Sequence, residues 1–299
     1  MKSADDSPVL LTVFTPTYNR AHTLARVYES LRAQPCKDFL WLIVDDGSTD
    51  HTAELVKAWQ AEENGFEIRY VYKENGGMHT AHNTAYENVD TELNVCIDSD
   101  DAMAENAVAL ILEKWEQVRN NGYAGIMGLD ADFAGRVIGS GFPEGLTEST
   151  VSGYYAAGGS GDKKLVYRTD IIKSVPPYPV FEGEKYVALS YKYRLIDQKY
   201  KMAVLDRTLC NVEYQEDGST KNMWRQYLRN PKGFAFWRLV RLQTPESAKR
   251  TLIDYVHYCS SSILAREKSF IRKAPSPALC AVCTPAGFLL SCIVKKKAR

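Results

Sequence analysis

The sequence predicts an α/β fold whose central sheet is mainly parallel, followed by a helical carboxyl-terminal extension. From residue 9 to about residue 130, apolar runs alternate with segments of helical periodicity, which is typical of strand–helix units joined by right-handed crossovers. Two of the apolar runs end in acidic clusters, at residues 45–48 and 98–101. Beyond Thr220 the sequence becomes mostly helical in pattern and rich in arginine and aromatic residues.

Strands are expected where β-branched and other apolar residues run together. The first four are expected at Val9–Phe14, Phe39–Val44, Glu67–Tyr72 and Leu93–Ile97. Helices follow them, marked by apolar residues at helical spacing: Leu24, Val27, Tyr28 and Leu31 in the first, Ala53, Val56 and Trp59 in the second, and Ala107, Leu110, Ile111 and Trp115 in the fourth. The second helix is expected to be capped by Ser48, Thr49 or Asp50, and the third to follow Gly76-Gly77.

After Gly122 the alternation loosens. The elements expected there are strands at Ala124–Leu129 and Lys164–Tyr167, a helix at Tyr186–Ile196, and short strands at Met202–Leu205 and Leu209–Glu213. The glycine-rich stretch at 158–161 is expected to form a mobile loop over a site. We expect one α/β domain at residues 8–215 and a helical extension at 216–299.

The composition narrows the function class. Because 37 Lys and Arg residues are matched by 37 Asp and Glu residues, the overall charge gives no support to nucleic-acid binding. The seven cysteines are scattered and odd in number, which favours reduced thiols in a cytosolic compartment. Cys280 and Cys283 form a lone CxxC pair, which we interpret as two apolar-facing residues and not as a zinc site. The polar amino terminus is unlike a signal peptide, so a cytoplasmic location is expected.

The two acidic clusters are the features most directly tied to chemistry. The sequence DDGS at 45–48 and the sequence DSDD at 98–101 both lie where a strand is expected to end, and ligands bind at the carboxyl ends of strands in α/β sheets. Carboxylates packed this closely repel each other unless a cation or hydrogen-bond donors offset their charge. A hard divalent cation, with positions left open to phosphate oxygens, meets that need. The pattern therefore predicts a metal-bound nucleotide diphosphate.

A third motif, TPTYNR at 15–20, ends the first strand and places Tyr18 where its ring could stack on a base. Each motif alone is compatible with an ordinary turn or helix cap. Taken together and in this order, the stretches TPTYNR, VDDGSTD, KENGG followed by HN, and DSDD resemble the family 2 glycosyltransferases of the bacterial cell-surface polysaccharide type. The resemblance covers about residues 8 to 215 and implies the GT-A fold, which is Rossmann-like with a mainly parallel central sheet.

The resemblance also implies roles for the matching positions. Tyr18 and Asp46 are expected against the nucleotide base, with Asp45 supporting that pocket. The full set of implied nucleotide-sugar-binding residues is Thr15, Tyr18, Asp45, Asp46, Asn75, His82 and Asp98. His82 stands where relatives often carry arginine, and a neutral imidazole would not counter diphosphate charge as arginine does, although an imidazolium would.

The second acidic cluster resembles the family's DxD pair. Asp98 is expected near the ribose or a bound water, and Asp100 is expected to bind Mn²⁺ or Mg²⁺, with Asp101 sharing the metal. Most members of the family invert the anomeric centre, which requires a base for the acceptor hydroxyl. Glu184, at the expected start of a helix, is the first choice and Glu182 the second. The family usually has Glu-Asp where this chain has Glu-Lys, and helix capping is the alternative role of Glu184.

The implied activity is that of a metal-dependent, inverting glycosyltransferase of the hexosyltransferase type. The donor is expected to be a nucleotide-sugar, UDP-linked, and the acceptor a saccharide or lipid-linked saccharide in surface polysaccharide synthesis. Two alternatives stay open. A sugar-phosphate nucleotidyltransferase would need a glycine-rich, basic loop after the first strand, which TPTYNR is not. A catalytically silent glycan- or membrane-binding module on the same fold would not need the carboxylates at 98, 100 and 184.

The tail carries a separate signal. Residues 278–294 hold no charged side chain, are interrupted by Pro285 and Gly287, and precede three lysines at 295–297. A spanning helix needs ~20 apolar residues, so a segment lying in the interface of an anionic membrane fits better, and the protein is expected at the inner face of the cell membrane. A helix packed on the protein's own core is the alternative. The basic and aromatic residues Arg225, Arg229, Lys232, Arg238, Arg241, Arg250, Trp224, Phe236 and Trp237 form either an extension of that membrane face or a solvated face.

Overall fold

The computed structural model describes residues 9–213, 222–245 and 247–298. Contacts within the chain divide it into two units. Unit 1 comprises residues 1–75, 80–177 and 192–213, and unit 2 comprises residues 76–79, 178–191 and 214–299. The boundary expected between residues 215 and 216 lies outside the described residues.

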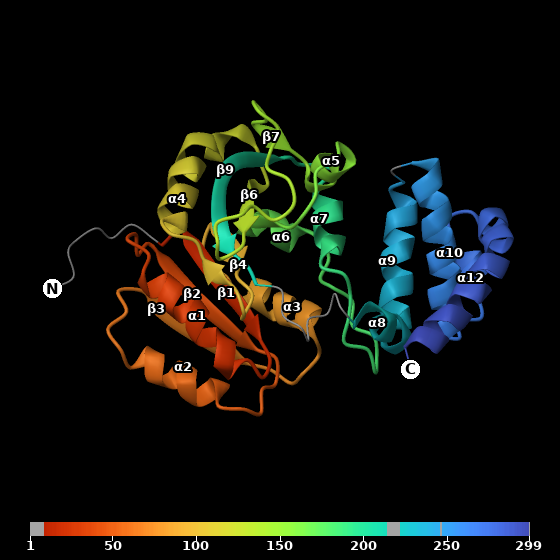
Figure 1. The fold of residues 1–299 in the computed structure, drawn as a ribbon, viewed down its shortest axis with the longest axis horizontal. Helices are drawn as coiled ribbons and strands as arrows, with labels where there is room; N and C mark the ends of the chain where they lie inside the picture. Colours follow the sequence, from red (N-terminus) through yellow and green to blue (C-terminus); the bar gives the residue numbers. More distant parts are fainter. Residues whose placement is uncertain (1–8, 214–221, 246, 299) are drawn as a thin grey trace. The chain divides into compact units, whose positions relative to one another are not determined.

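Unit 1 is built on one mixed sheet, shown in Figure 1, with the strand order β3-β2-β1-β4-β8-β6-β9-β5 and with β7 paired to β9. The strands are β1 (Leu11–Thr17), β2 (Phe39–Asp45), β3 (Glu67–Tyr72), β4 (Leu93–Cys96), β5 (Ala102–Met103), β6 (Gly125–Ala131), β7 (Glu148–Ser149), β8 (Lys163–Arg168) and β9 (Met202–Asn211). The neighbours β3, β2, β1 and β4 are parallel, whereas β8 runs antiparallel between β4 and β6. The expected α/β fold with a mainly parallel centre is confirmed.

The helices before residue 200 are α1 (Ala21–Arg32), α2 (Thr52–Gln60), α3 (Met78–Asn88), α4 (Ala107–Val118), a short 3₁₀ helix (Arg119–Asn121), α5 (Val151–Ala156), α6 (Thr169–Ser174) and α7 (Ser190–Ile196). The buried face of α1 consists of the four residues that its spacing predicted. In α2 the apolar residues Val56 and Trp59 are buried as expected, but Ala53 is exposed.

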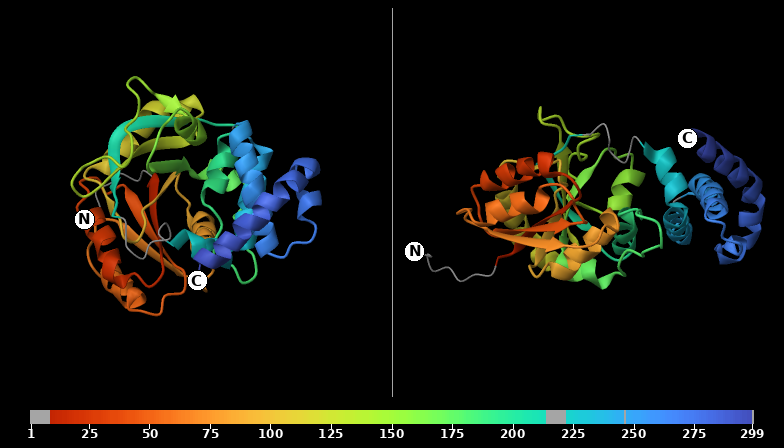
Figure 2. Two further views of the ribbon diagram at one scale, coloured as in Figure 1. Left: turned by 45° about the vertical axis from the view of Figure 1, so that its right-hand side comes forward. Right: turned by 90° about the horizontal axis from the view of Figure 1, so that it is seen from below.

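Two helical layers cover the sheet, as Figure 2 shows for α1 and α2 on one face and α3 on the other. On the first face, Tyr28 stacks on Trp59 with ring centroids 4.3 Å apart, and both rings pack with Trp41 of β2. On the second face, Phe14 of β1 meets the edge of Tyr86 of α3. Alternate residues of β1 therefore bury into different layers, as the two-residue period of a strand requires.

The winding of the chain reverses at β1. The connections through α1 and α2 carry the chain from β1 to β2 and on to β3, whereas α3 returns it to β4 on the opposite side of β1. Where winding reverses, the loops after the two central strands separate and leave a crevice at their carboxyl ends. TPTYNR spans the end of β1 and the turn after it, and DSDD follows β4, so the fold places both motifs at this reversal.

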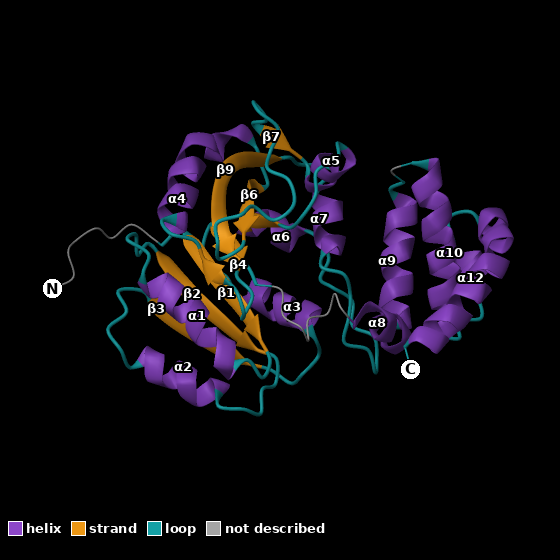
Figure 3. Cartoon of the chain, in the orientation of Figure 1, coloured by secondary structure: helices purple, strands orange, loops and turns teal. Residues whose placement is uncertain are grey.

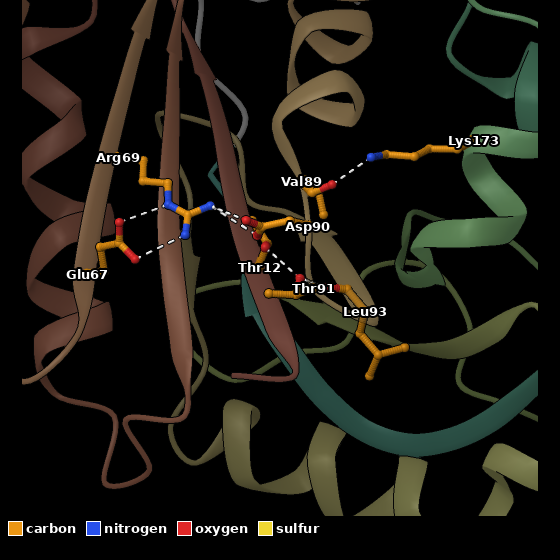
Figure 4. Close-up of polar contacts among 8 residues, drawn as sticks. All are labelled: Thr12, Glu67, Arg69, Val89, Asp90, Thr91, Leu93 and Lys173. Carbon is orange, nitrogen blue, oxygen red and sulfur yellow. Dashed lines mark hydrogen bonds and ion pairs between the residues drawn. The ribbon is translucent and has the colours of Figure 1, made fainter. Parts of the chain in front are cut away.

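Polar contacts fix the opposite, amino-terminal edge of the same strands (Figure 4). Arg69 of β3 donates from Nη1 to both carboxylate oxygens of Asp90, at 3.0 and 2.9 Å. The hydroxyls of Thr12 and Thr91 are 2.6 Å apart in the interior. Because the buried pair lies on β1 and on the segment that enters β4, it holds these two strands in the register that brings their far ends together.

Two expectations about residues 178–213 are corrected. The helix expected at Tyr186–Ile196 begins only at Ser190. The segment before it is held in a non-helical conformation, since the Tyr178 hydroxyl donates to the carbonyl of Leu189 and the N–H of Lys185 donates to Asn230 Oδ1. The two short strands expected near the end form a single strand, β9, whose register on β6 contains irregularities instead of a break.

Between residues 222 and 298, the described part of unit 2 is helical (Figure 3). Its helices are α8 (Met223–Arg229), α9 (Pro231–Gln243), α10 (Ala248–Leu264), α11 (Phe270–Lys273) and α12 (Pro277–Lys297). A small core forms among Leu242, Tyr255, Tyr258, Cys259, Ala274, Cys280 and Cys283. Cys280 and Cys283 thus face the interior, as expected for this CxxC pair, and no group of three metal-binding side chains occurs in the described residues.

The expectation that two arginines of α9 lie on the surface is wrong. Arg238 and Arg241, expected on a membrane-facing or solvated face, donate to the two carboxylate oxygens of Asp254 on α10, at 2.6 and 2.9 Å. All three side chains are largely buried. A buried carboxylate must be paired to avoid a desolvation cost, so this triad joins α9 to α10.

The carboxyl-terminal segment is one continuous helix, α12, and not the interrupted segment that Pro285 and Gly287 suggested. By length and composition α12 could cross a membrane, and only 28% of its apolar stretch is buried. Its inward face consists of small residues and one valine, namely Cys280, Cys283, Gly287, Ser291 and Val294. Gly287 supports the close approach to α10, because a Cβ at this position would lie 2.4 Å from Cys259 Cβ and 3.0 Å from Ser260 N.

Replacing Gly287 with leucine should therefore destabilise unit 2. The added side chain has no room against α10, and overpacking of this kind costs ~1–3 kcal/mol, or more where backbone must shift. The matched control is Ala286→Leu, which adds a similar side chain on the exposed side of the same turn. Thermal unfolding followed by circular dichroism should show a lower midpoint for Gly287→Leu only. Equal midpoints for the two variants would contradict the close packing of α10 and α12.

Candidate active site

The carboxyl ends of β1, β2 and β4 bring the sequence-predicted acidic clusters of unit 1 to one edge of the sheet. Two loops there are joined by reciprocal hydrogen bonds. The N–H of Asn19 donates to Ser48 Oγ at 2.9 Å, and the N–H of Thr49 donates to Asn19 Oδ1 at 2.8 Å. Asn19 adopts a left-handed conformation with φ 53°, which asparagine tolerates better than most residues. TPTYNR and DDGS therefore form one rigid surface.

Asp50 extends this junction. Its carboxylate accepts from the N–H of Ala21 at the start of α1 and from the N–H and hydroxyl of Thr52 at the start of α2. The hydrogen bonds outweigh burial and lower the pKa of Asp50. The side chain therefore serves two helix starts at once, whereas the sequence predicted a cap for α2 alone.

Asp45 is buried and fully engaged. One oxygen accepts from the N–H of Ser48 at 2.7 Å, and the other accepts from the hydroxyl of Tyr70 at 2.6 Å. Burial, followed by the hydrogen bond to Asp45, raises the pKa of the Tyr70 hydroxyl above its usual value. These contacts make Asp45 a support for the turn, and the neighbouring Asp46 is also buried.

Asp46 is paired with the lysine of the KENGG motif, for which the sequence predicted no role. Lys73, directly after β3, donates to Asp46 Oδ1 at 2.6 Å and to the hydroxyl of Thr80 at 2.9 Å. Asn75 donates from Nδ2 to the backbone oxygen of Asp46 at 2.7 Å. Gly47 allows this approach, because its φ is +85° and a Cβ there would lie 2.8 Å from Asn75 N. The motifs DDGS and KEN are thus one structural element.

The second acidic cluster concentrates negative charge. Asp98 and Asp100 are partly buried, and Asp101 is buried. Burial and then the charge of Asp98 raise the pKa of Asp100. Burial, with the charges of Asp98 and Asp100, raises the pKa of Asp101 to about 7 in spite of Lys164. Like-charge repulsion of this kind is relieved when a cation is bound.

A buried lysine lies behind this cluster. Lys164 of β8 lies with Nζ 3.8 Å from Asp130 Oδ1 and 3.4 Å from the carbonyl of Cys96. Burial alone would lower the pKa of Lys164. The surrounding negative groups, of which Asp130 contributes most, nevertheless raise this pKa well above its usual value. The ammonium therefore offsets part of the carboxylate charge from the protein side. Asp130 ends β6 and Lys164 lies within β8, so only the sheet topology brings them to the second cluster.

The donor set fits a divalent cation only in part. Carboxylate oxygens are the ligands that Mg²⁺ and Mn²⁺ prefer, and the second cluster supplies two of them at Asp100 and Asp101. Within the described residues no preformed group of three ligating side chains exists. The arrangement thus suits a metal that completes its coordination with oxygens of another molecule, such as a diphosphate.

The remaining predicted residues of unit 1 differ in exposure. Tyr18 is 47% exposed at the end of β1, so its ring is free to pack on a ligand. Thr15 is buried and its hydroxyl accepts the indole N–H of Trp41 at 3.0 Å. His82 is buried on α3, with Nδ1 3.3 Å from the Tyr86 hydroxyl and its ring edge-on to Phe14. Thr15 and His82 therefore lie below the surface, where they support β1 and α3.

The two glutamates predicted for base catalysis lie in unit 2. Glu184 is 9% exposed and does not begin a helix. Its two carboxylate oxygens each accept one backbone N–H, from Lys232 and Gly233 in the first turn of α9, at 2.9 Å. This is the helix-capping arrangement, made here to a helix distant in sequence. Glu182 is exposed.

The same segment of unit 2 explains a glycine of the KENGG stretch. Gly77 has φ +93°, and a Cβ there would lie 2.1 Å from the carbonyl oxygen of Lys185. Only glycine permits so close an approach between these two backbones. The segment at 76–79 therefore packs directly beside the segment that carries Glu184.

The comparisons with known proteins agree with this geometry. Residues 12–132 match the sequence model described as Glycosyl transferase family 2. That region includes TPTYNR, DDGS, KENGG and DSDD. Residues 12–132 are thus similar in sequence to the family 2 glycosyltransferases. The resemblance that the motifs indicated is confirmed.

Curated relatives of the family 2 domain are matched over limited stretches. The chain is 32% identical over 104 residues to glycosyltransferase GlyA of Streptococcus pneumoniae, a match that covers 35% of this chain and 15% of that protein. It is 22% identical over 262 residues to the GalNAc(5)-diNAcBac-PP-undecaprenol beta-1,3-glucosyltransferase of Campylobacter jejuni, covering 84% of this chain and 79% of that protein. The stretches aligned at 30% identity or more span between about a tenth and a little over a third of those relatives' length.

Solved structures share the fold. TarS residues 1–349 of S. aureus, in complex with UDP-GlcNAc, superimposes with a TM-score of 0.58 at 18% identity, covering 88% of this chain and 76% of that one. The mannosyltransferase PcManGT of Pyrobaculum calidifontis, in complex with GDP-Man and Mn²⁺, gives a TM-score of 0.54 at 17% identity, covering 100% and 84%. The expected GT-A fold is thereby confirmed.

Proposed function

We propose that the protein is a glycosyltransferase that moves a sugar from a nucleotide-sugar, UDP-linked, to a saccharide or lipid-linked saccharide acceptor. The observation that carries the proposal is the gathering of Asp46, Tyr18 and the 98–101 cluster at the strand ends where β1 and β4 separate. The family 2 match covers these residues. The UDP-GlcNAc complex of TarS and the GDP-Man complex of PcManGT, which share the fold, support a nucleotide-sugar donor.

On the donor side, Tyr18 would pack on the base and Asp46 would accept a base N–H, while Asn75 and Lys73 hold Asp46 in place. Asp45 would support this pocket through Ser48 and Tyr70. Asp98 would bind near the ribose or an ordered water. Thr15 and His82 would act as supports, because both are buried.

A divalent cation, Mn²⁺ or Mg²⁺, would be held by Asp100 with a contribution from Asp101. When bound, such a cation neutralises charge that develops on the departing diphosphate. The Mn²⁺ in the PcManGT complex, and in the complex of GalNAc-T7 with UDP and GalNAc, supports this assignment. Lys164, on the protein side of the cluster, would limit the negative charge that the metal must balance.

For an inverting transfer, a base takes the proton of the acceptor hydroxyl while that oxygen bonds to the anomeric carbon and the bond to the diphosphate breaks. Glu184 is proposed as this base and Glu182 as its alternate. The two backbone N–H groups that hold Glu184 occupy one position on each of its oxygens, and a carboxylate oxygen has a second lone pair for a proton. The capping contacts equally fit a purely structural carboxylate, which is what a catalytically silent module would retain.

The outward face of α12 supports a peripheral position at the membrane. Its exposed side chains are apolar, with Leu289 64% exposed and Val282, seven residues earlier, on the same face. Three lysines at 295–297 end the helix. Apolar residues at the surface and a basic end are the features of a helix that lies in the interface of an anionic membrane. Since α12 packs on α10, which carries Arg250 and Asp254, an interfacial position fits better than a spanning one.

The metal assignment predicts different losses for two aspartates. Asp100→Ala should abolish the metal dependence of UDP binding, because a hard cation loses a charged ligand. Asp46→Ala should weaken UDP binding and leave its dependence on Mn²⁺ intact. Calorimetric titration of UDP with and without Mn²⁺ distinguishes the two. Unchanged metal dependence in the Asp100→Ala protein would show that the cluster does not bind the metal.

The base assignment predicts that Glu184→Gln lowers the transfer rate by about 10²-fold or more, in line with general-base contributions, while UDP affinity stays near that of the parent protein. Glu182→Gln is the matched control, since the same change is made two residues away on an exposed side chain. Release of nucleotide diphosphate from a donor panel measures the rate. A normal rate in Glu184→Gln with a loss in Glu182→Gln would transfer the role to Glu182. Normal rates in both would exclude this mechanism.

The membrane position predicts that Leu289→Glu weakens binding to phosphatidylglycerol vesicles by about tenfold or more, because a buried leucine contributes ~1.5–3 kcal/mol and a buried carboxylate opposes insertion. Val137→Glu is the control, since it places the same charge on an exposed apolar residue of unit 1. Vesicle co-sedimentation at low and high salt measures both. Equal binding of the two variants would exclude the α12 face as the contact.

A further inference from the structure

Unit 2 contains a cavity that the donor chemistry does not use. It lies between α8, α10 and α12 and has a volume of about 280 Å³. Its apolar lining consists of Met223, Trp224, Tyr227, Leu264, Leu290 and Val294. An apolar cavity of roughly 150 Å³ is large enough to take benzene. This cavity therefore has room for a longer hydrocarbon segment.

One wall of the cavity is polar but uncharged. His257, Ser260 and Ser261 lie three and four residues apart on α10, so they share a helix face. Ser260 and Ser261 are only 3% and 4% exposed, so this wall is shielded from bulk water. Burial, followed by the charge of Arg238, lowers the pKa of His257 to about 4, so its ring is neutral at neutral pH. The wall can accept or donate hydrogen bonds but holds no fixed charge.

A cation lies at the rim. Trp224 is 36% exposed and so marks an edge where the cavity approaches the surface. Lys297 Nζ lies 4.7 Å from the centroid of its ring, within the range of a cation–π contact. Lys295 and Lys296 precede it at the end of α12. An apolar interior with an ammonium at its edge matches an amphiphile with a negative head group.

We propose that this cavity binds one hydrocarbon chain of an anionic membrane lipid, with the lipid head group at Lys297. The helix α12 forms both the cavity wall, through Leu290 and Val294, and the exposed apolar face, through Leu289. To enter the cavity, one acyl chain of a lipid beside α12 has to pass only around the end of this helix. The inference rests on the membrane attachment proposed above and specifies how a single lipid is held.

The test uses the full-length protein and phosphatidylglycerol vesicles in which one acyl chain carries a photoactivatable diazirine. After irradiation, mass spectrometry of peptides locates the label. We expect label within residues 260–264, where Ser260, Ser261 and Leu264 line the cavity from α10. Ser261→Leu fills the cavity and should reduce that label about tenfold, while vesicle sedimentation and UDP binding stay unchanged. Ala281→Leu, which adds the same side chain on the exposed side of α12, should label like the parent.

A second variant keeps the test decisive if Ser261→Leu lowers the melting temperature. Lys297→Glu leaves the cavity lining intact and should reduce the label at 260–264 severalfold by repelling the head group. Label confined to the outer face of α12, or label at 260–264 that neither variant reduces, would overturn the inference while membrane attachment stands. If laurate in solution protected residues 260–264 from hydrogen exchange while phosphatidylglycerol vesicles gave no label there, the cavity would bind a soluble fatty acid and not a membrane lipid. Failure to sediment with vesicles would overturn the attachment and the inference together.

Discussion

Negative charge gathered at the ends of neighbouring strands is the constraint on which the candidate site depends. Carboxylates from residues 45–46, 98–101 and 130 lie at the carboxyl edge of one sheet, and several of them are buried. Buried like charges destabilise a fold unless they are compensated. The protein compensates the first group with Lys73 and the last with Lys164. In the 98–101 cluster, burial and then the charges of Asp98 and Asp100 raise the pKa of Asp101 in spite of Lys164.

The carboxylates at this sheet edge differ in the contacts that they make. Asp45 and Asp50 accept hydrogen bonds on both oxygens and thereby hold turns and helix starts. Asp98 and Asp100 retain carboxylate surface at the point where the winding of the sheet reverses. In the site proposed above, Asp100 with Asp101 would hold a cation with phosphate ligands, and Asp98 would lie near the ribose or an ordered water. The same sheet edge thus contains residues that stabilise the loops and residues that we propose bind the ligand.

Unit 2 follows a different rule. In most helices of soluble proteins the large apolar residues pack inward. In α12, small residues pack inward and the larger apolar residues are exposed. The small residues let α12 approach α10 closely, and the polar interior of the unit is held by the triad of Arg238, Arg241 and Asp254. A helix of this kind leaves apolar surface that water solvates poorly. Both the proposed membrane position and the lipid-chain cavity follow from this reversal.

The sequence by itself determined the elements whose signal is local, whereas tertiary structure alone decided those that depend on distant partners. Strand periodicity located β1 to β4, helical spacing located the buried face of α1, and the motifs at the strand ends indicated the family. These features depend on neighbouring residues and on the side-chain periods of strands and helices, so they are visible in one dimension.

Lys164 and Asp130, by contrast, reach the acidic cluster because β8 and β6 lie beside β4 in the sheet. Glu184 was expected to begin its own helix, but it caps α9, because the N–H groups of Lys232 and Gly233 are available to it only after the chain folds back. Gly287 looked like an interruption of α12, yet it is a position at which α10 comes very close. Pairings across such sequence separations carry no local periodicity, and for that physical reason they appear only in the folded chain.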